Sequence, residues 1–82
     1  MEIIFTKHAK EKFEILLKHK FKVEKSQVLQ ALKNPENIDY SRIPLIIAQR
    51  KIDKNHYLRV VYKKENNKIK IITFYPTRIK KI

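Results

Sequence analysis

The chain has 82 residues, of which 43% are hydrophobic, and it contains no cysteine. This length predicts a single domain over residues 1–82, and the lack of cysteine excludes disulfides and thiolate metal sites. Twenty basic against eight acidic residues give a net charge of +12, which favours polyanionic partners.

The N-terminal part of the sequence predicts a short strand followed by a helix. Residues 2–5, EIIF, have the apolar character of a strand. Thr6 can cap the helix after it, because its hydroxyl can accept a bond from a free N–H of the first turn. We expect this helix from Lys7 to Lys20, and apolar residues at helical spacing predict its core stripe, namely Ala9, Phe13, Leu16 and Leu17.

A shorter helix is expected over residues 24–33. Asn34-Pro35 ends it, because proline cannot continue the helical hydrogen bonds and its predecessor avoids the helical region. Residues 34–42 then read as a polar loop. The expected buried side chains of this helix are Val28, Leu29 and Leu32, with Val23 packing at its start.

The remaining sequence predicts three strands, at residues 43–50, 56–64 and 68–75. Asn66-Asn67 separates the last two, and asparagine tolerates the positive φ values of a tight hairpin. Tyr75 is expected to end the last strand, because Pro76 follows it. The element order is therefore β-α-α-β-β-β, an α+β fold with two N-terminal helices packed on an antiparallel sheet.

The last two strands are apolar on both faces. Pairing them across the Asn-Asn turn predicts the partners Tyr62–Ile71, Val60–Thr73 and Leu58–Tyr75 on one face, and Val61–Ile72 and Arg59–Phe74 on the other. Two helices can cover only one face of the sheet. The other face is left for a partner, a second subunit in a homodimer, or solvent.

The charge is concentrated at the C-terminal end, where residues 56–82 hold eight basic side chains and a single acid, Glu65. Three interpretations stay open: contact with nucleic acid or the ribosome, an acidic protein partner, or a solvated basic surface. The sequence shows neither a membrane-spanning apolar run nor a signal-peptide pattern, so we expect a soluble, cytoplasmic protein with no membrane contact.

A second line of side chains runs along the first helix, opposite its core stripe. His8, Lys12, Ile15 and His19 follow each other at helical spacing, so they form either a solvated face or a contact surface for RNA or a partner. At the helix start the dipole favours the neutral ring of His8, which suits a hydrogen-bond acceptor or proton acceptor. His8 and His19 are about 16 Å apart along the axis, too far to share a metal ion, and no cofactor is expected.

Arg59 interrupts the apolar alternation of L-R-V-V-Y (58–62). If its side chain points into the sheet, it needs an anion or a carboxylate. Two interpretations stay open. Arg59 forms an ion pair with an acidic residue, namely Glu11, Glu14 or Asp53, or its guanidinium binds a phosphate.

The stretch TFYPTRIKKI (73–82) places an aromatic ring, Tyr75, beside cations at Arg78, Lys80 and Lys81. Such a group can stack a base and hold a nucleic-acid backbone, or simply attract any polyanion. The chain has no glycine, hence no glycine-rich phosphate loop, and its two serines lack a nucleophile context. The chemistry left without a metal is transphosphorylation of RNA by its own 2′-hydroxyl.

Four segments together resemble a small domain-of-unknown-function family, number 4258. They are T-K-H-A-K-E-K-F (6–13), V-x-x-x-x-V-L-x-A-L-x-N-P-E (23–36), L-R-V-V-Y (58–62) and I-I-T-F-Y-P-T-R (71–78), which span nearly the whole chain. That family is similar to the RelE/ParE superfamily of toxins, including its BrnT-like branch, which has the same β-α-α-β-β-β order. The resemblance implies the toxin of a toxin–antitoxin pair, with an acidic antitoxin as partner.

The family's functional positions carry over unevenly. His8 matches the T-x-H-A histidine, Arg59 the strand arginine, and Tyr75 and Arg78 the terminal Y-x-x-R. Lys12 stands where the family often has arginine, which weakens a bidentate phosphate contact there. The glycine common after the first helix is missing near Lys22.

From these observations we expect a metal-independent mRNA endoribonuclease, with or without a need for the ribosome. The alternatives are a non-catalytic nucleic-acid-binding module and a toxin directed at a protein such as gyrase. The predicted catalytic residues are His8, Arg59, Tyr75 and Arg78, gathered in one pocket at the start of the first helix, and the predicted RNA-binding residues are Lys7, Lys12, Lys80 and Lys81.

Overall fold

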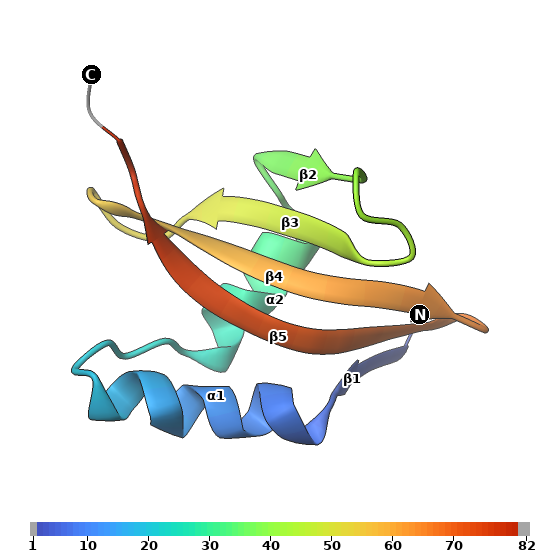
Figure 1. Ribbon diagram of the computed structural model, residues 1–82, viewed down its shortest axis with the longest axis horizontal. Coiled ribbons are helices and arrows are strands. Elements are labelled where there is room, and N and C mark those ends of the chain that lie inside the picture. Colours follow the sequence, from blue (N-terminus) through green and yellow to red (C-terminus); the bar gives the residue numbers. More distant parts are fainter. Residues whose placement is uncertain (1, 81–82) are drawn as a thin grey trace.

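The computed structural model describes residues 2–80 and has the predicted α+β class, with two helices and one five-stranded mixed sheet (Figure 1). Both helices precede the long strands in the chain, as the sequence predicts. The elements in chain order are β1 (Glu2–Phe5), α1 (Lys7–Lys18), α2 (Lys25–Lys33), β2 (Asn37–Asp39), β3 (Ile46–Lys51), β4 (His56–Glu65) and β5 (Lys68–Arg78). Among the described residues no helix is long and apolar enough to cross a membrane.

The sheet has the strand order β1-β5-β4-β3-β2 and differs from the prediction in two ways. First, β1 pairs with β5 in parallel, so the sheet is mixed and not wholly antiparallel. Second, the expected polar loop contains the short strand β2, which extends the sheet beside β3. Both differences concern the pairing of strands at the edges of the sheet. Apolar alternation along one strand does not tell which strand pairs with it or in which direction.

The helix boundaries follow from their caps. Thr6 caps α1 as predicted, its side-chain oxygen accepting a bond of 3.2 Å from the backbone N–H of Ala9. The helix ends at Lys18, two residues earlier than expected, and Lys20 then takes the left-handed conformation with φ of 61°. Glycine is the usual residue in that conformation because it has no side chain to clash. This chain has no glycine, so a lysine takes the position at which a glycine would be less strained.

The core lies between the two helices and one face of the sheet. Phe74 of β5 is fully buried, and the ring of Phe13 on α1 packs on it with 4.6 Å between ring centroids. Leu17 is 57% exposed, so its predicted place in the core stripe is wrong. The fully buried members of the core are Ala9, Val28, Ala31, Ala48, Leu58, Val60, Ile71 and Phe74.

The β4–β5 hairpin contains a bulge that shifts its register. Asn66 and Asn67 both have positive φ, 44° and 63°, and Tyr62 pairs with Ile71, both as predicted. Beyond that pair the ladder slips by one residue, with Ile72 left over on β5. The four other predicted pairs are therefore wrong, and the observed ones are Val61–Thr73, Val60–Phe74, Arg59–Tyr75 and Leu58–Pro76.

The bulge lies where the start of α1 meets the sheet. The Thr6 hydroxyl is 3.0 and 3.1 Å from the carbonyl oxygens of Ile71 and Ile72, so it bonds the backbone that the bulge frees from the ladder. At its other end, β5 runs through Pro76 to Arg78 and does not stop at Tyr75. The proline is tolerated because β1 pairs only with Lys68–Ile71, which leaves that edge of β5 free beside Pro76.

Candidate functional site

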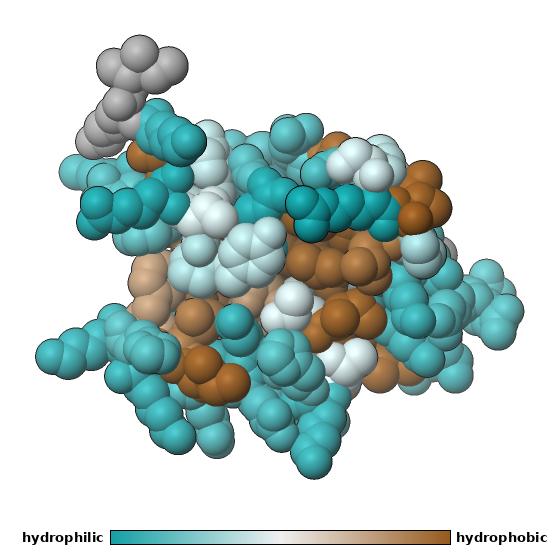
Figure 2. Space-filling view, in the orientation of Figure 1, coloured by the Kyte–Doolittle hydropathy of each residue, from teal (hydrophilic) through white to brown (hydrophobic). Residues whose placement is uncertain are grey.

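The sheet face opposite the core is not covered by either helix. Helix α2 lies behind β4 in Figure 1, and α1 packs on the same core face. Strand alternation then directs a set of mixed side chains to the other face, which we call the open face. Figure 2 shows, in the same orientation, apolar side chains across the middle with polar ones above and below. The central residues of the open face are Ile47, Gln49, Arg59, Val61, Thr73 and Tyr75.

Arg59 is at the centre of the hydrogen bonds on this face. Its Nε donates to the hydroxyl of Tyr75 at 3.1 Å, and its Nη1 donates to Oε1 of Gln49 at 2.7 Å. Both partners are its ladder neighbours, one on each side, and the guanidinium carbon lies 6.0 Å from the centroid of the Tyr75 ring. Because the register shift puts Tyr75 opposite Arg59, the β5 bulge is what creates this contact.

The acidic neighbour of Arg59 is Asp39 of β2, with 4.0 Å between Nη2 and Oδ2. The expected partners, Glu11, Glu14 and Asp53, are therefore wrong. Hydrogen bonding from Ser41 is the main cause that keeps the pKa of Asp39 below its ordinary value, and the positive charge of Arg59 adds to it. The long distance and partly exposed side chains make this a weak ion pair, which an arriving anion can displace.

The structure does not bring the four predicted catalytic residues into one pocket. Arg59 and Tyr75 are in contact, but His8 is exposed in the first turn of α1. Arg78 pairs with His56 in the ladder, and alternation places it on the helix side of the sheet with Pro76. It is seven residues along β5 from the place where the start of α1 is attached, about 23 Å away.

The predicted RNA-binding lysines are also scattered. Lys7 is exposed and Lys12 half-buried on α1, which packs on the core face, while Lys80 is exposed beyond the end of β5. Lys81 lies outside the described residues. The sequence reasoning missed Gln49 and Asp39 as neighbours of Arg59. Alternation from Ile47 could have found Gln49, whereas Asp39 was assigned to a loop.

A second cluster of polar side chains lies at the turn that connects β3 to β4. Nδ1 of His56 is 2.9 and 3.1 Å from the two carboxylate oxygens of Asp53, and its ring packs edge-on to Phe21 at 4.8 Å. A hydrogen bond from the backbone N–H of Asn55, followed by that from His56, holds the pKa of Asp53 below its ordinary value. Among residues 2–80 no group of three or more candidate ligands is arranged to hold a metal ion.

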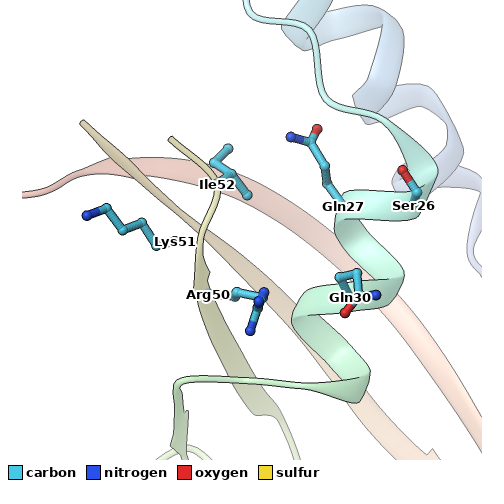
Figure 3. Close-up of a pocket in the computed structure, with 6 residues that line it drawn as sticks. All are labelled: Ser26, Gln27, Gln30, Arg50, Lys51 and Ile52. Atoms are coloured by element: carbon cyan, nitrogen blue, oxygen red, sulfur yellow. The ribbon is translucent and has the colours of Figure 1, made fainter. Parts of the chain in front are cut away.

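Two hollows lie elsewhere, between α2 and the end of β3. One has a volume of about 220 Å³ and contains none of the predicted site residues (Figure 3). Its lining residues are Ser26, Gln27, Gln30, Arg50, Lys51 and Ile52.

Comparison with known proteins returns no relative. No protein-family model matches the chain, and no curated protein or solved structure matches it either. The arrangement of two helices on one face of a five-stranded mixed sheet defines the class of the protein as α+β. A fold class does not by itself give a function.

Proposed function

We propose that this protein is the toxin of a toxin–antitoxin pair and acts on RNA through the open face, as a metal-independent endoribonuclease. The observation that carries the proposal is the contact between Arg59 and Tyr75 on a sheet face that no described helix covers. The net charge of +12 supports a polyanionic substrate. The sequence motifs and the β-α-α-β-β-β order, here with β2 added, support a RelE/ParE-like fold.

The Arg59–Tyr75 pair has the groups that phosphate and base recognition require. The guanidinium can donate to two non-bridging oxygens of one phosphate once Asp39 is displaced. The Tyr75 hydroxyl accepts a bond from Arg59, so its own proton is free to point at the substrate. The ring of Tyr75 can stack on an unpaired base, a contact that tolerates any sequence.

The proposed reaction needs few protein groups. The 2′-hydroxyl of the substrate attacks the adjacent phosphorus, the bond to the 5′-oxygen breaks, and a 2′,3′-cyclic phosphate and a 5′-hydroxyl result. Arg59 stabilises the charge that grows on the phosphoryl oxygens, and Tyr75 donates its proton to the departing 5′-oxygen. The 2′ proton passes to solvent, which later restores the proton of Tyr75.

His8 and Arg78 have no role at this centre in the proposal, because neither lies on the open face. Because Arg78, Lys7, Lys12 and Lys80 are scattered, in the proposal they contribute only to the overall positive charge that attracts RNA. The proposed antitoxin is an acidic protein that covers the open face and displaces RNA from Arg59. Ribosome binding would use the same positive surface.

The direct test is the chemistry of the product. Incubating the protein with mRNA, with and without ribosomes and in the presence of a chelator, should give fragments with 2′,3′-cyclic phosphate ends. Arg59→Ala should lower the cleavage rate about 10²-fold or more, the scale of losing one positioned donor to the reacting oxygens. Lys18→Ala removes the same charge from an exposed residue of α1, on the other side of the sheet, and is the matched control. Equal cleavage by both variants would remove the Arg59–Tyr75 pair from the proposal.

One observation favours a second function, non-catalytic RNA binding. Among the described residues, the proton-transfer group that touches Arg59 is Tyr75, since His8 lies on α1. Binding needs no second ionisable group. RNA retained intact by the parent protein, and released by Arg59→Ala but not by Lys18→Ala, would favour this function over cleavage.

A further inference from the structure

The groove between α2 and β3 has a composition that suits a negatively charged ligand. Its first hollow, of about 220 Å³, is lined by the start of α2 and by residues 50–52 (Figure 3). A second hollow of about 220 Å³ adjoins it, because Gln27 and Ile52 line both. Together they form what we call the α2 groove, on the opposite face of the sheet from Arg59.

The two glutamine side chains of the first hollow offer donor groups to a ligand. The Oε1 atom of Gln27 accepts a bond of 2.9 Å from the backbone N–H of Glu24. The Oε1 atom of Gln30 accepts one of 2.9 Å from Nδ2 of Asn34. Among residues 2–80, the amide NH₂ group of each glutamine has no hydrogen-bond partner, so it can donate to a ligand that brings acceptors, and the hydroxyl of Ser26 can donate as well.

Arg50 supplies the positive charge of the hollow. Its Nη1 donates to the backbone carbonyl of Asn34 at 2.8 Å, which holds the guanidinium against the end of α2, and its other N–H groups have no partner among residues 2–80. In Figure 3 the Arg50 side chain points towards α2, whereas the Lys51 side chain points away from it. A planar, fixed guanidinium suits bidentate contact with phosphate oxygens.

The second hollow adds two lysines and one aromatic ring. Lys20, Phe21 and Lys22 line it from the turn after α1. Its acid, Asp53, has its carboxylate oxygens in hydrogen bonds with Asn55 and His56, which diminishes its demand for a cation. Lys22 Nζ lies 3.7 Å from a carboxylate oxygen of Glu24, so the positive charge that a ligand meets comes mainly from Arg50 and Lys20.

We propose that the α2 groove binds a phosphate group, which Arg50 grips with its guanidinium and Gln27 contacts through its amide NH₂. The first hollow is smaller than a drug-sized site of about 300–1,000 Å³, so it suits a phosphate and not a larger anion. The phosphate is either free or part of a nucleotide, whose nucleoside then lies beside Phe21 in the second hollow. The proposal does not depend on the RNA site of the open face, because Arg50 and Arg59 project to opposite sides of the sheet.

The test is a titration of ¹⁵N-labelled protein with inorganic phosphate, 5′-AMP and adenosine at constant ionic strength, followed by NMR. The side-chain NH₂ signals of Gln27 and Gln30 report on the hollow directly. Saturable shifts of these signals with phosphate and 5′-AMP are expected. Tighter binding of 5′-AMP identifies a nucleotide as the ligand, and equal binding identifies free phosphate.

Two variants and a control make the test specific. Arg50→Ala should weaken binding about tenfold or more, since it removes a charge-assisted contact. Gln27→Glu keeps an acceptor for the Glu24 N–H, so α2 keeps its start, but it replaces the donor with a carboxylate and should also weaken binding about tenfold or more. Arg42→Ala lowers the net charge equally at a distant loop and should leave binding unchanged.

The outcomes separate a built site from general attraction to a basic surface. Losses with Arg50→Ala and Gln27→Glu but not with Arg42→Ala would support the proposal, provided that the backbone spectra stay dispersed. An equal loss with Arg42→Ala, or full binding by the stably folded Gln27→Glu variant, would overturn it. So would adenosine binding as tightly as 5′-AMP.

Discussion

Replacing Tyr75 with phenylalanine removes the hydroxyl that accepts a hydrogen bond from Nε of Arg59 and leaves the ring in place. A hydrogen bond to a charged group contributes about 1.5–3 kcal/mol when it is shielded from water. The side chain of Arg59 is 26% exposed, so water can replace part of the lost contact, and we expect a loss of about 1 kcal/mol. For a domain of this size that lowers Tm by about 4–8 °C.

The assay is a double-mutant cycle in urea. Tyr75→Phe, Arg59→Ala and the double variant are compared with the parent protein by far-UV circular dichroism, and RNA affinity is measured on the same four proteins. The coupling energy between the two positions should exceed about 0.5 kcal/mol, because the residues are in contact. Tyr57→Phe, which removes a hydroxyl two residues from Arg59 on the same strand face, is the control.

The reasoning fails if the two substitutions are additive within about 0.3–0.5 kcal/mol, the range found for independent sites. It also fails if Tyr57→Phe weakens RNA binding as much as Tyr75→Phe. Either result would mean that Arg59 and Tyr75 are neighbours without acting together.

Three further predictions concern single side chains. Asp39→Asn should tighten RNA binding about two- to fivefold in a filter-binding assay, because it removes the carboxylate that faces Arg59; unchanged affinity would mean that the phosphate does not approach there. Lys20→Gly should raise the free energy of unfolding by about 0.5–1 kcal/mol through relief of the left-handed strain, whereas Lys10→Gly within α1 should lower it by about 1 kcal/mol; a loss at both positions would contradict this. Hydrogen bonds from Lys63 and Lys70 hold the pKa of Glu65 below its ordinary value of 4.5. The stabilisation that these bonds give is therefore present above about pH 4.5 and is lost as the pH falls through the folded-state pKa. In urea titrations at about pH 6 and pH 3, the free energy of unfolding should fall less with acid for Glu65→Gln than for the parent protein.

Much of the fold could be predicted from local chemistry. Thr6 gave the start of α1, the Asn66-Asn67 pair gave the hairpin turn, and apolar spacing gave the helices and the three long strands. The parallel place of β1 and the strand β2 could not be predicted, because edge pairing depends on the whole chain. The exposure of Leu17 shows a similar limit, since its neighbour Leu16 is buried against the core and spacing alone does not tell which of the two faces it.

The candidate site could be predicted only in part, because the sequence does not reveal the register between β4 and β5. Arg59 and Tyr75, both candidates from the sequence, are in contact in the structure, but the predicted register put Phe74 opposite Arg59. A bulge changes which residues meet and has no signature in the spacing of these residues. His8 and Arg78 were grouped with them by residue type and by sequence resemblance, and neither gives the face on which a side chain lies.

The pairing of β1 with the start of β5 also has a kinetic consequence. Glu2–Phe5 pairs in the sheet with Lys68–Ile71, so the chain between these two segments must be closed into one loop before the N-terminal strand finds its partner. Contacts between such distant segments form late and slow the search for the native state. During synthesis, β1 and the outer edge of β4 therefore stay unpaired until β5 has emerged, and the nascent chain depends on α1 and α2 to shield its apolar surface until then.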